Sequence, residues 1–210
     1  MRDIDHGSST GYFIQKLVPH QCNDLDRWCY GWEGSNFHCY LSYMRLADIY
    51  LMYAEARAAI AKSAAELKDK PEYCPSLSAV DAINVLRDRV NCEDYPMEHV
   101  QPNLMDTREH FIDEVRRERA VELSFEGFRW CDLQRWLLLT EPPYTVKYSH
   151  EFERLETNDW FKTHDPKDAK VGNFHKKDLI TRRLESKHYW FPLPDKDTYL
   201  YPGFPQNPGW

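Results

Sequence analysis

The stretch Thr107–Trp136 reads TREHFIDEVRRERAVELSFEGFRWCDLQRW, and this charged segment decides how the rest of the chain is interpreted. Large apolar side chains are spaced along it: Phe111, Val115, Val121, Phe125, Phe128, Trp130 and Trp136. Charged groups among such side chains are expected to be partly buried, and buried charges must be paired. The segment therefore predicts either a catalytic cluster of acids or a network of ion pairs that holds helices together.

The ends of the helices in this stretch are predicted from capping residues and one glycine. Asp106 and Glu109 are spaced like an N-cap and its capping-box partner. Gly127 stands where a helix would end in a left-handed residue. We therefore predict one long helix from Thr107 to Glu126, a break at the glycine, and a short helix from Arg129 to Leu138.

The charges of this stretch keep a regular spacing across the predicted break. They recur first at four-residue and then at three-residue steps: Glu118, Glu122, Glu126, Arg129, Asp132 and Arg135. Two such carboxyl groups could serve a glycosidase as acid and nucleophile. Nearby arginines would keep each carboxyl group ionised, however, and an ionised group is a poor general acid. We therefore favour a structural lattice of arginines and acids over catalysis.

Upstream, Tyr43 to Ala65 is predicted to form the first helix, because apolar residues recur there at helical spacing on two sides. One stripe is Leu46, Ile49, Tyr50, Tyr53, Arg57 and Ile60, and the other is Met44, Ala47, Leu51, Ala54 and Ala58. A helix with two apolar sides is expected to be sandwiched between other elements. Its many alanines would permit close packing.

A second helix is predicted to begin after Ser76 or Ser78, either of which can cap it, and to end at Val90. The two helices then form an antiparallel hairpin of the tetratricopeptide kind. Glu55 of the first helix is expected to pair with an arginine of the long charged helix. The complete predicted ion network is Arg45, Glu55, Glu118, Glu122, Glu126, Arg129, Asp132 and Arg135.

Strong helical periodicity is confined to residues 43–139, the predicted helical body. Residues 1–42 form an aromatic and glycine-rich loop region, and residues 140–210 carry eight of the thirteen prolines. We predict that residues 140–210 are a long, mostly irregular tail that wraps around the helices. The fold class is therefore mainly α.

An alternating aromatic row lies in the amino-terminal loop region. Trp28, Tyr30 and Trp32 share one side if the backbone is extended, and Asn36 follows as a polar neighbour. Exposed aromatic rings can stack on sugar rings, while a nearby amide supplies hydrogen bonds. The alternative is that the row packs on the helices behind it, as large aromatic side chains usually do. These four residues are our candidates for ligand contact.

Composition excludes several classes of protein. The chain has 210 residues, 42% of them hydrophobic and 14% aromatic, which is enough for one sizeable core. Its 27 Lys and Arg residues are outnumbered by 34 Asp and Glu residues, so the net charge of −7 disfavours nucleic-acid binding. The chain has no apolar run of about eighteen residues and no secretion signal after Met1, so we expect no membrane span and no visible route of export.

Known metal and catalytic motifs are absent from the sequence. The six cysteines form no CxxC pair, which disfavours a redox motif or a zinc knuckle. Several metal-binding residue types do lie close together, without a zinc spacing: His20, Cys22, Cys29, His38 and Cys39. The chain also lacks HExxH, GxSxG, a Walker loop and GxGxxG. We therefore expect no metal, no cofactor and no enzymatic activity.

Several motifs, taken together and in order, resemble those of the SusD/RagB family. They are Tyr43–Ala56 (YMRLADIYLMYAEA), Ala82–Arg89 (AINVLRDR), Val115–Trp136 (VRRERAVELSFEGFRWCDLQRW), and the closing segments Phe191–Pro194 (FPLP) and Gln206–Trp210 (QNPGW). The resemblance covers a carboxy-terminal part of the family's sequence, whose members are longer and begin with a lipoprotein signal. One departure is Tyr201-Pro-Gly, where the family more usually has Asn-Pro.

The resemblance implies a mostly helical outer-membrane nutrient-binding lipoprotein on the cell surface. Such proteins cover a SusC-like, TonB-dependent transporter and deliver oligosaccharides, or in some members peptides, to it without catalysis. They are held at the membrane through an amino-terminal lipid anchor, which is absent from this sequence. On an oxidising cell surface the cysteines could pair, but the sequence does not indicate which pairs.

Two other functions stay open at this point. One is an intracellular tetratricopeptide-like scaffold that binds segments of other proteins. The other is a surface protein of the same family that binds peptides in place of oligosaccharides.

Overall fold

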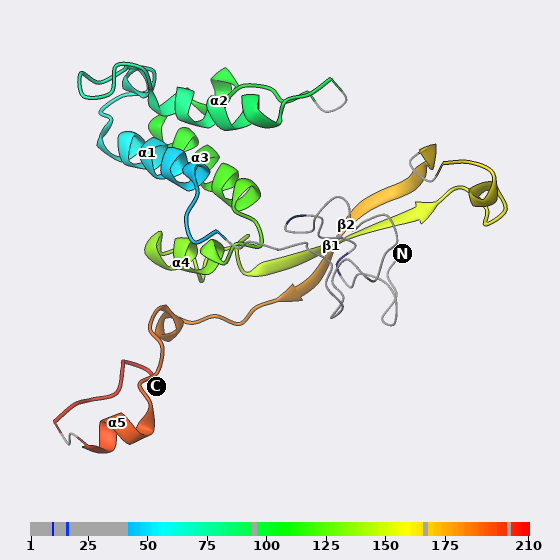
Figure 1. Cartoon of the computed structure of the whole chain (residues 1–210). Coiled ribbons are helices and arrows are strands. Elements are labelled where there is room, and N and C mark those ends of the chain that lie inside the picture. The colour runs from blue at the N-terminus through cyan, green and yellow to red at the C-terminus, as the bar shows by residue number, and fades with distance from the viewer. Residues whose placement is uncertain (1–9, 11–15, 17–41, 94–95, 166–167, 201–202) are drawn as a thin grey trace, which may run out of the picture. The chain divides into compact units, whose positions relative to one another are not determined.

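The structure is a computed structural model that describes residues 10, 16, 42–93, 96–165, 168–200 and 203–210. The chain divides into two compact units, one of Asp26–Arg129 and the other of Met1–Leu25 with Trp130–Trp210. Helices α1, α2 and α3 lie in the first unit, which we call the helical unit, and strands β1 and β2 lie in the second (Figure 1). The predicted mainly helical class is confirmed.

Helix α1 spans Leu46–Ile60 and is shorter at both ends than predicted, because Arg45 and the C-cap residue Ala61 have extended backbones. A short 3-10 helix, Ala65–Leu67, follows it. The buried side of α1 is Ala47, Asp48, Leu51, Ala54 and Ala58. The other predicted stripe is largely open, since Leu46 is 65% and Ile60 is 64% exposed. Tyr50 and Tyr53 of this stripe nevertheless pack against the core, and α1 contacts both α2 and α3, as a sandwiched helix would, although the ends of the stripe are exposed.

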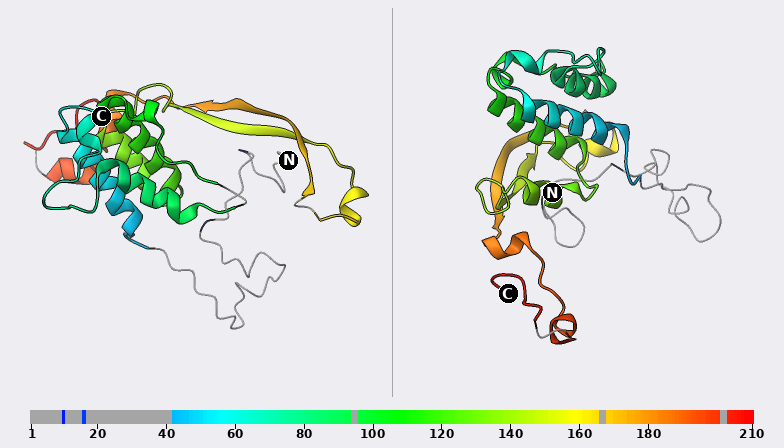
Figure 2. Two further views of the ribbon diagram at one scale, coloured as in Figure 1. Left: turned by 90° about the horizontal axis from the view of Figure 1, so that it is seen from above. Right: turned by 90° about the vertical axis from the view of Figure 1, so that its left-hand side faces the viewer.

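Helix α2 spans Ala79–Val90, and Ser78 is the serine that caps it. The Ser78 hydroxyl accepts a hydrogen bond from the Asp81 N–H at 3.0 Å, and the Asp81 carboxylate accepts one from the Ser78 N–H at 3.1 Å. This reciprocal capping box fixes the first turn of α2. Helices α1, α2 and α3 lie side by side in both figures (Figure 1, Figure 2).

Helix α3 spans Arg108–Glu122, and its start differs from the prediction. The N-cap is Thr107, whose hydroxyl accepts a hydrogen bond from the His110 N–H at 3.0 Å. Asp106 instead bonds the imidazole of His110 at 2.6 Å. The predicted capping pair of Asp106 and Glu109 is therefore wrong, because a threonine one residue later supplies the cap.

The end of α3 also comes earlier than the predicted Glu126. Leu123 ends the helix and is buried, and the chain then turns through Phe125 (φ 63°) and Gly127 (φ 86°). Glycine adopts a positive φ without steric cost, which suits Gly127 to this turn. Helix α4, Phe128–Arg135, follows directly and ends before Leu137, which has a φ of 57°.

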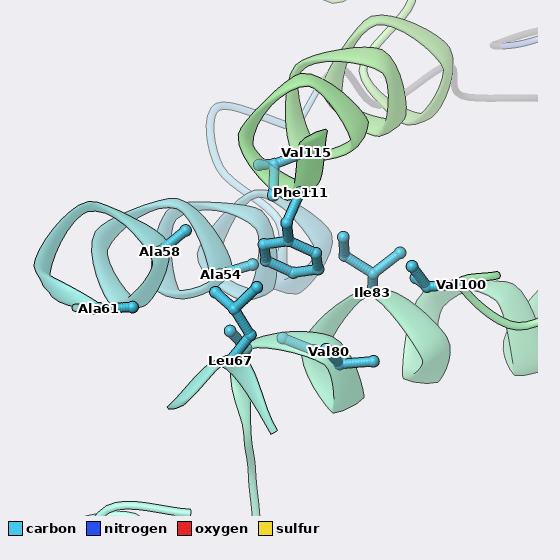
Figure 3. Packing of buried hydrophobic residues seen from close by; sticks show 11 residues of the cluster. Ala54, Ala58, Ala61, Leu67, Val80, Ile83, Val100, Phe111 and Val115 are labelled. Atoms are coloured by element: carbon cyan, nitrogen blue, oxygen red, sulfur yellow. The ribbon is translucent and has the colours of Figure 1, made fainter. Parts of the chain in front are cut away.

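A small apolar core lies between α1, α2 and α3 (Figure 3). Phe111 of α3 is fully buried, and its ring points toward Ala54 of α1 and Ile83 of α2 (Figure 3). The small alanine side chains let α1 approach the ring closely, as the sequence predicted. Burying one such phenylalanine stabilises the fold by about 1.5–3 kcal/mol.

The predicted irregular tail contains a two-stranded antiparallel sheet, which corrects that prediction. Strand β1, Val146–Arg154, pairs with β2, Val171–Thr181, with Ser149 opposite Lys177 (Figure 1, Figure 2). Glu151 of β1 lies 3.2 Å from both His175 and Lys177 of β2. The strands were missed because β2 carries mostly polar residues, so it shows no apolar alternation. A short 3-10 helix, Trp160–Lys162, lies in the connection.

The carboxy-terminal segment folds back on itself after the 3-10 helix Ser186–Tyr189 and the short helix α5, Asp195–Leu200. The side-chain amide of Gln206 bonds both the N–H and the carbonyl of Leu193, at 2.7 and 2.9 Å. The Trp210 indole donates to the carbonyls of Lys187 and Trp190 at 3.1 and 3.0 Å. These bonds close the end of the chain into a loop. Whether residues 140–210 wrap around the helices stays a prediction.

None of the helices in the described part of the chain is long and apolar enough to cross a lipid bilayer.

Candidate functional site

The four residues predicted to contact a ligand, Trp28, Tyr30, Trp32 and Asn36, lie outside the residues that the structure describes. Their role therefore stays a prediction. Within the described residues, polar chemistry gathers where charged side chains of α1, α2 and α3 meet. These side chains form two groups, which we call the inner and the outer cluster.

The inner cluster is Arg87 of α2 with Glu114, Arg117 and Glu118 of α3. The Arg87 Nη2 bonds a carboxylate oxygen of Glu114, and it also lies 2.8 Å from Glu118 Oε2. Arg117 adds bonds of 2.7 and 2.8 Å to the Glu114 carboxylate. Arg87, Glu114 and Glu118 are all at most 5% exposed. Such charges are tolerated in the interior only because each has an opposite charge and hydrogen bonds.

The outer cluster is Arg45, which precedes α1, with Arg89 of α2, Glu122 of α3 and Glu126 in the turn that follows. The Arg45 guanidinium bonds Glu126 through Nε at 2.8 Å and Nη2 at 2.7 Å, and Glu122 through Nη1 at 2.6 Å. Arg89 Nη2 donates to the same Glu122 oxygen at 2.7 Å. The helix break before Glu126 thus leaves both glutamates able to bond one arginine.

A further buried pair joins α1 and α3 between these clusters. Arg119 Nη1 donates to Asp48 Oδ1 at 2.9 Å, and both side chains are less than a tenth exposed. Together with the clusters, this pair links α3 to both helices of the α1–α2 hairpin through charged groups. The core around Phe111 supplies the apolar part of the same interface.

The remaining members of the predicted network are Glu55, Arg129, Asp132 and Arg135. Asp132 Oδ1 accepts bonds from Arg135 at 3.0 and 2.9 Å within α4, and Arg129 donates to the Arg116 carbonyl at 3.4 Å. Glu55 is half-buried on α1.

Sequence reasoning left several members out of the network: Asp48, Arg87, Arg89, Glu114, Arg117 and Arg119. For some of these residues the sequence contains a spacing pattern that could have identified them. Glu114 and Glu118 are four residues apart, as are Glu118 and Glu122, so the acidic row on α3 begins one turn earlier than predicted. Nothing local indicates that Arg87 and Asp48 are the residues that meet this helix, because their partners are distant in the sequence.

The electrostatics of the inner cluster hold Glu114 ionised. Burial acts to raise the pKa of Glu114, but hydrogen bonds from Arg117 and Arg87 outweigh it, and the pKa lies below its ordinary value. The bond to Glu114 correspondingly raises the pKa of Arg117, and bonding to Glu126 and Glu122 raises the pKa of Arg45 despite burial. An acid that stays charged at neutral pH cannot donate a proton in general acid catalysis.

In the described part of the chain, no group of three or more His, Cys, Asp or Glu side chains could hold a metal ion. Cys74 and Cys131 are free thiols.

An open hollow of about 490 Å³ lies beside the outer cluster. Its lining comes from the beginning of α1 and the end of α2: Arg45, Leu46, Ala47, Tyr50, Val85, Leu86 and Arg89. The walls are mostly apolar, and the two arginines are the charged groups among the lining residues. The hollow therefore combines an apolar interior with cationic groups at its edge.

The chain is similar to one known protein family and to solved structures. The model of the SusD family matches residues 2–210. Among solved structures, a SusD-like protein, BF3747 from Bacteroides fragilis NCTC 9343, is similar with a TM-score of 0.52 and 23% identity, over 80% of this chain and 25% of that chain. BT4246 is similar with the same TM-score and identity, over 84% of this chain and 25% of that chain.

These structural relatives share the fold at low identity, and this chain spans about a quarter of the length of each. No match was found among curated proteins.

Proposed function

Because the chain belongs to the SusD family, we propose that it is the carboxy-terminal part of a surface protein that captures oligosaccharides without catalysis. The SusD family comprises nutrient-binding lipoproteins associated with the outer membrane. The captured oligosaccharide would then pass to a SusC-like, TonB-dependent transporter. The observation that carries this proposal is the family match over residues 2–210, nearly the whole chain.

The chemistry of the described residues supports binding over catalysis. The acids of the inner cluster are bonded to arginines at short distances, and the lowered pKa of Glu114 keeps that group ionised. A glycosidase needs one carboxyl group that carries a proton at working pH. The acids of α3 are therefore better explained as ties between helices.

Sugar contact is proposed for the aromatic row, Trp28, Tyr30 and Trp32, with Asn36 as its hydrogen-bonding neighbour. Sugar rings have apolar faces that stack on aromatic rings, and their hydroxyl groups need a few well-placed polar partners. The row has both kinds of group within nine residues.

Isothermal titration calorimetry of the 210-residue chain against a panel of oligosaccharides and peptides tests this function. We expect an oligosaccharide to bind, and we expect the double variant Trp28→Ala/Trp32→Ala to weaken that binding by at least tenfold. Tyr43→Ala is the matched control, because this tyrosine is fully exposed yet lies outside the row. Unchanged affinity in the double variant would show that the row does not contact sugar, and binding of peptides alone would replace the proposed ligand class.

The transporter partnership needs a separate measurement on the protein made from its own gene in the cells that produce it. Affinity purification after mild detergent extraction should recover a TonB-dependent outer-membrane barrel in stoichiometric amount. Recovery of the protein from the cytoplasmic fraction, without such a barrel, would contradict both the partnership and the surface location.

A further inference from the structure

We propose that the hollow between the beginning of α1 and the end of α2 binds a small organic acid, whose apolar body fills the hollow and whose carboxylate meets Arg89. The residues that line this hollow belong to the helical unit, and none of those residues is a member of the aromatic row. It therefore goes beyond oligosaccharide capture, and its test can fail without affecting that proposal.

The walls of the hollow suit an apolar body. Ala47 and Leu86 are almost fully buried, whereas Leu46 is 65% and Val85 is 39% exposed. The buried pair thus forms the floor and the exposed pair the open rim of the hollow that they line together. Its volume of about 490 Å³ lies within the range of about 300–1,000 Å³ that small-molecule sites occupy. Aliphatic walls with a single tyrosine favour a hydrocarbon or phenyl group over a sugar ring.

The two arginines at the hollow differ in how many donors they have left. Arg45 uses Nε, Nη1 and Nη2 in bonds to Glu122 and Glu126, so its guanidinium is committed to the outer cluster. Among the described residues, Arg89 bonds only Glu122, through Nη2, and its side chain is 54% exposed. A guanidinium has five N–H donors, so Arg89 can accept a second acidic partner in a two-bond arrangement.

Charge complementarity selects an acid over a neutral ligand. Arg89 is the cation at the rim with unused donors, and a carboxylate matches the fork of a guanidinium better than a hydroxyl does. The outer cluster as a whole is neutral, since two arginines face two glutamates. The attraction therefore comes from Arg89 locally, and we expect affinity in the millimolar range.

Methyl-detected NMR titration of the 210-residue chain tests the proposal with three probes. The first is 3-phenylpropionate, which has both the apolar phenyl group and the carboxylate. The second is 3-phenylpropanol, which keeps the phenyl group but has a hydroxyl in place of the carboxylate, and the third is propionate, which has the carboxylate but lacks the phenyl ring. We expect 3-phenylpropionate to shift the methyl resonances of Leu46 and Val85, with about tenfold tighter binding than the alcohol. Propionate should leave these resonances unshifted over the same concentration range.

Variants separate the two parts of the site. Arg89→Gln should abolish the preference for the acid while the alcohol still binds, and Val85→Asp should weaken both phenyl probes. Arg108→Gln is the matched control, because Arg108 is a similarly exposed arginine on α3 that pairs with Glu109 instead. The proposal is overturned if no probe shifts the methyl groups of the hollow, if the acid and the alcohol bind the unmodified chain equally, or if Arg108→Gln acts like Arg89→Gln.

Discussion

The inner and outer clusters use the same residue types in different surroundings. In the inner cluster, the side chains of Arg87 and Glu114 are 5% and 2% exposed. In the outer cluster, Arg45 and Glu122 are 24% and 12% exposed, and Arg89 is more than half exposed. Water can therefore reach the outer charges when a partner is lost, but it reaches the inner ones poorly. The same ion pair should thus be far harder to break in the inner cluster than in the outer one.

Arg87→Ala is expected to have the largest effect. It removes the buried arginine that bonds both Glu114 and Glu118, and their carboxylates keep only the bonds to Arg117, whose side chain is 54% exposed, among the contacts of the inner cluster. Removing one partner of a buried pair costs about 3–5 kcal/mol. Urea denaturation followed by circular dichroism measures the change in the free energy of unfolding. A loss no greater than that of Arg89→Ala, the matched arginine two residues away in the outer cluster, would contradict the difference between the clusters.

Glu122→Ala should have an intermediate effect. It removes the oxygen that Arg45 and Arg89 share, but Arg45 keeps its two bonds to Glu126. The expected loss is about 1.5–3 kcal/mol, the range for hydrogen bonds to charged groups. The same denaturation experiment measures it, and an unchanged unfolding midpoint would mean that the outer cluster does not contribute to stability.

The smallest loss in the free energy of unfolding is expected from mild acid, and it should arise from Glu114 in the inner cluster. The pKa of Glu114 is lower in the folded chain than its ordinary value, so its contribution is complete above the unfolded pKa of about 4.3. That contribution is lost as the pH falls through the lower folded pKa. Stability measured between pH 7 and pH 3 should therefore fall toward acid, and more gently in Glu114→Gln. An identical slope in that variant would assign the acid sensitivity to other groups.

Local signals in the sequence predicted much of the helical unit. The apolar side of α1, the capping serine of α2 and the glycine turn after α3 all depend on neighbours within a few residues, and the structure contains them. Helix ends were less predictable. Leu123, the C-cap residue of α3, belongs to one apolar cluster with Leu51 and Leu86, residues that the local sequence around it does not reveal.

The charged network shows more clearly that local sequence does not reveal contacts between distant residues. The sequence identified an acidic row on α3 and arginines able to meet it, but partners within the structure are far apart in the chain. Arg45 lies 81 residues from Glu126, and Asp48 lies 71 residues from Arg119. No spacing rule relates such residues, because their meeting depends on how the helices cross.

The sequence by itself determined that this chain is helical, that its acids would pair with arginines, and that it resembles the SusD/RagB family. Helical periodicity, capping residues and the order of motifs depend on residues that are close together in the sequence, so the sequence alone reveals them. Only the tertiary structure decided which stripe of α1 is buried and which acid each arginine bonds. It also showed that the strongly charged stretch contains a deeply buried cluster and a more exposed one. Those outcomes depend on the burial that packing creates, and burial sets how strongly each charge needs its partner.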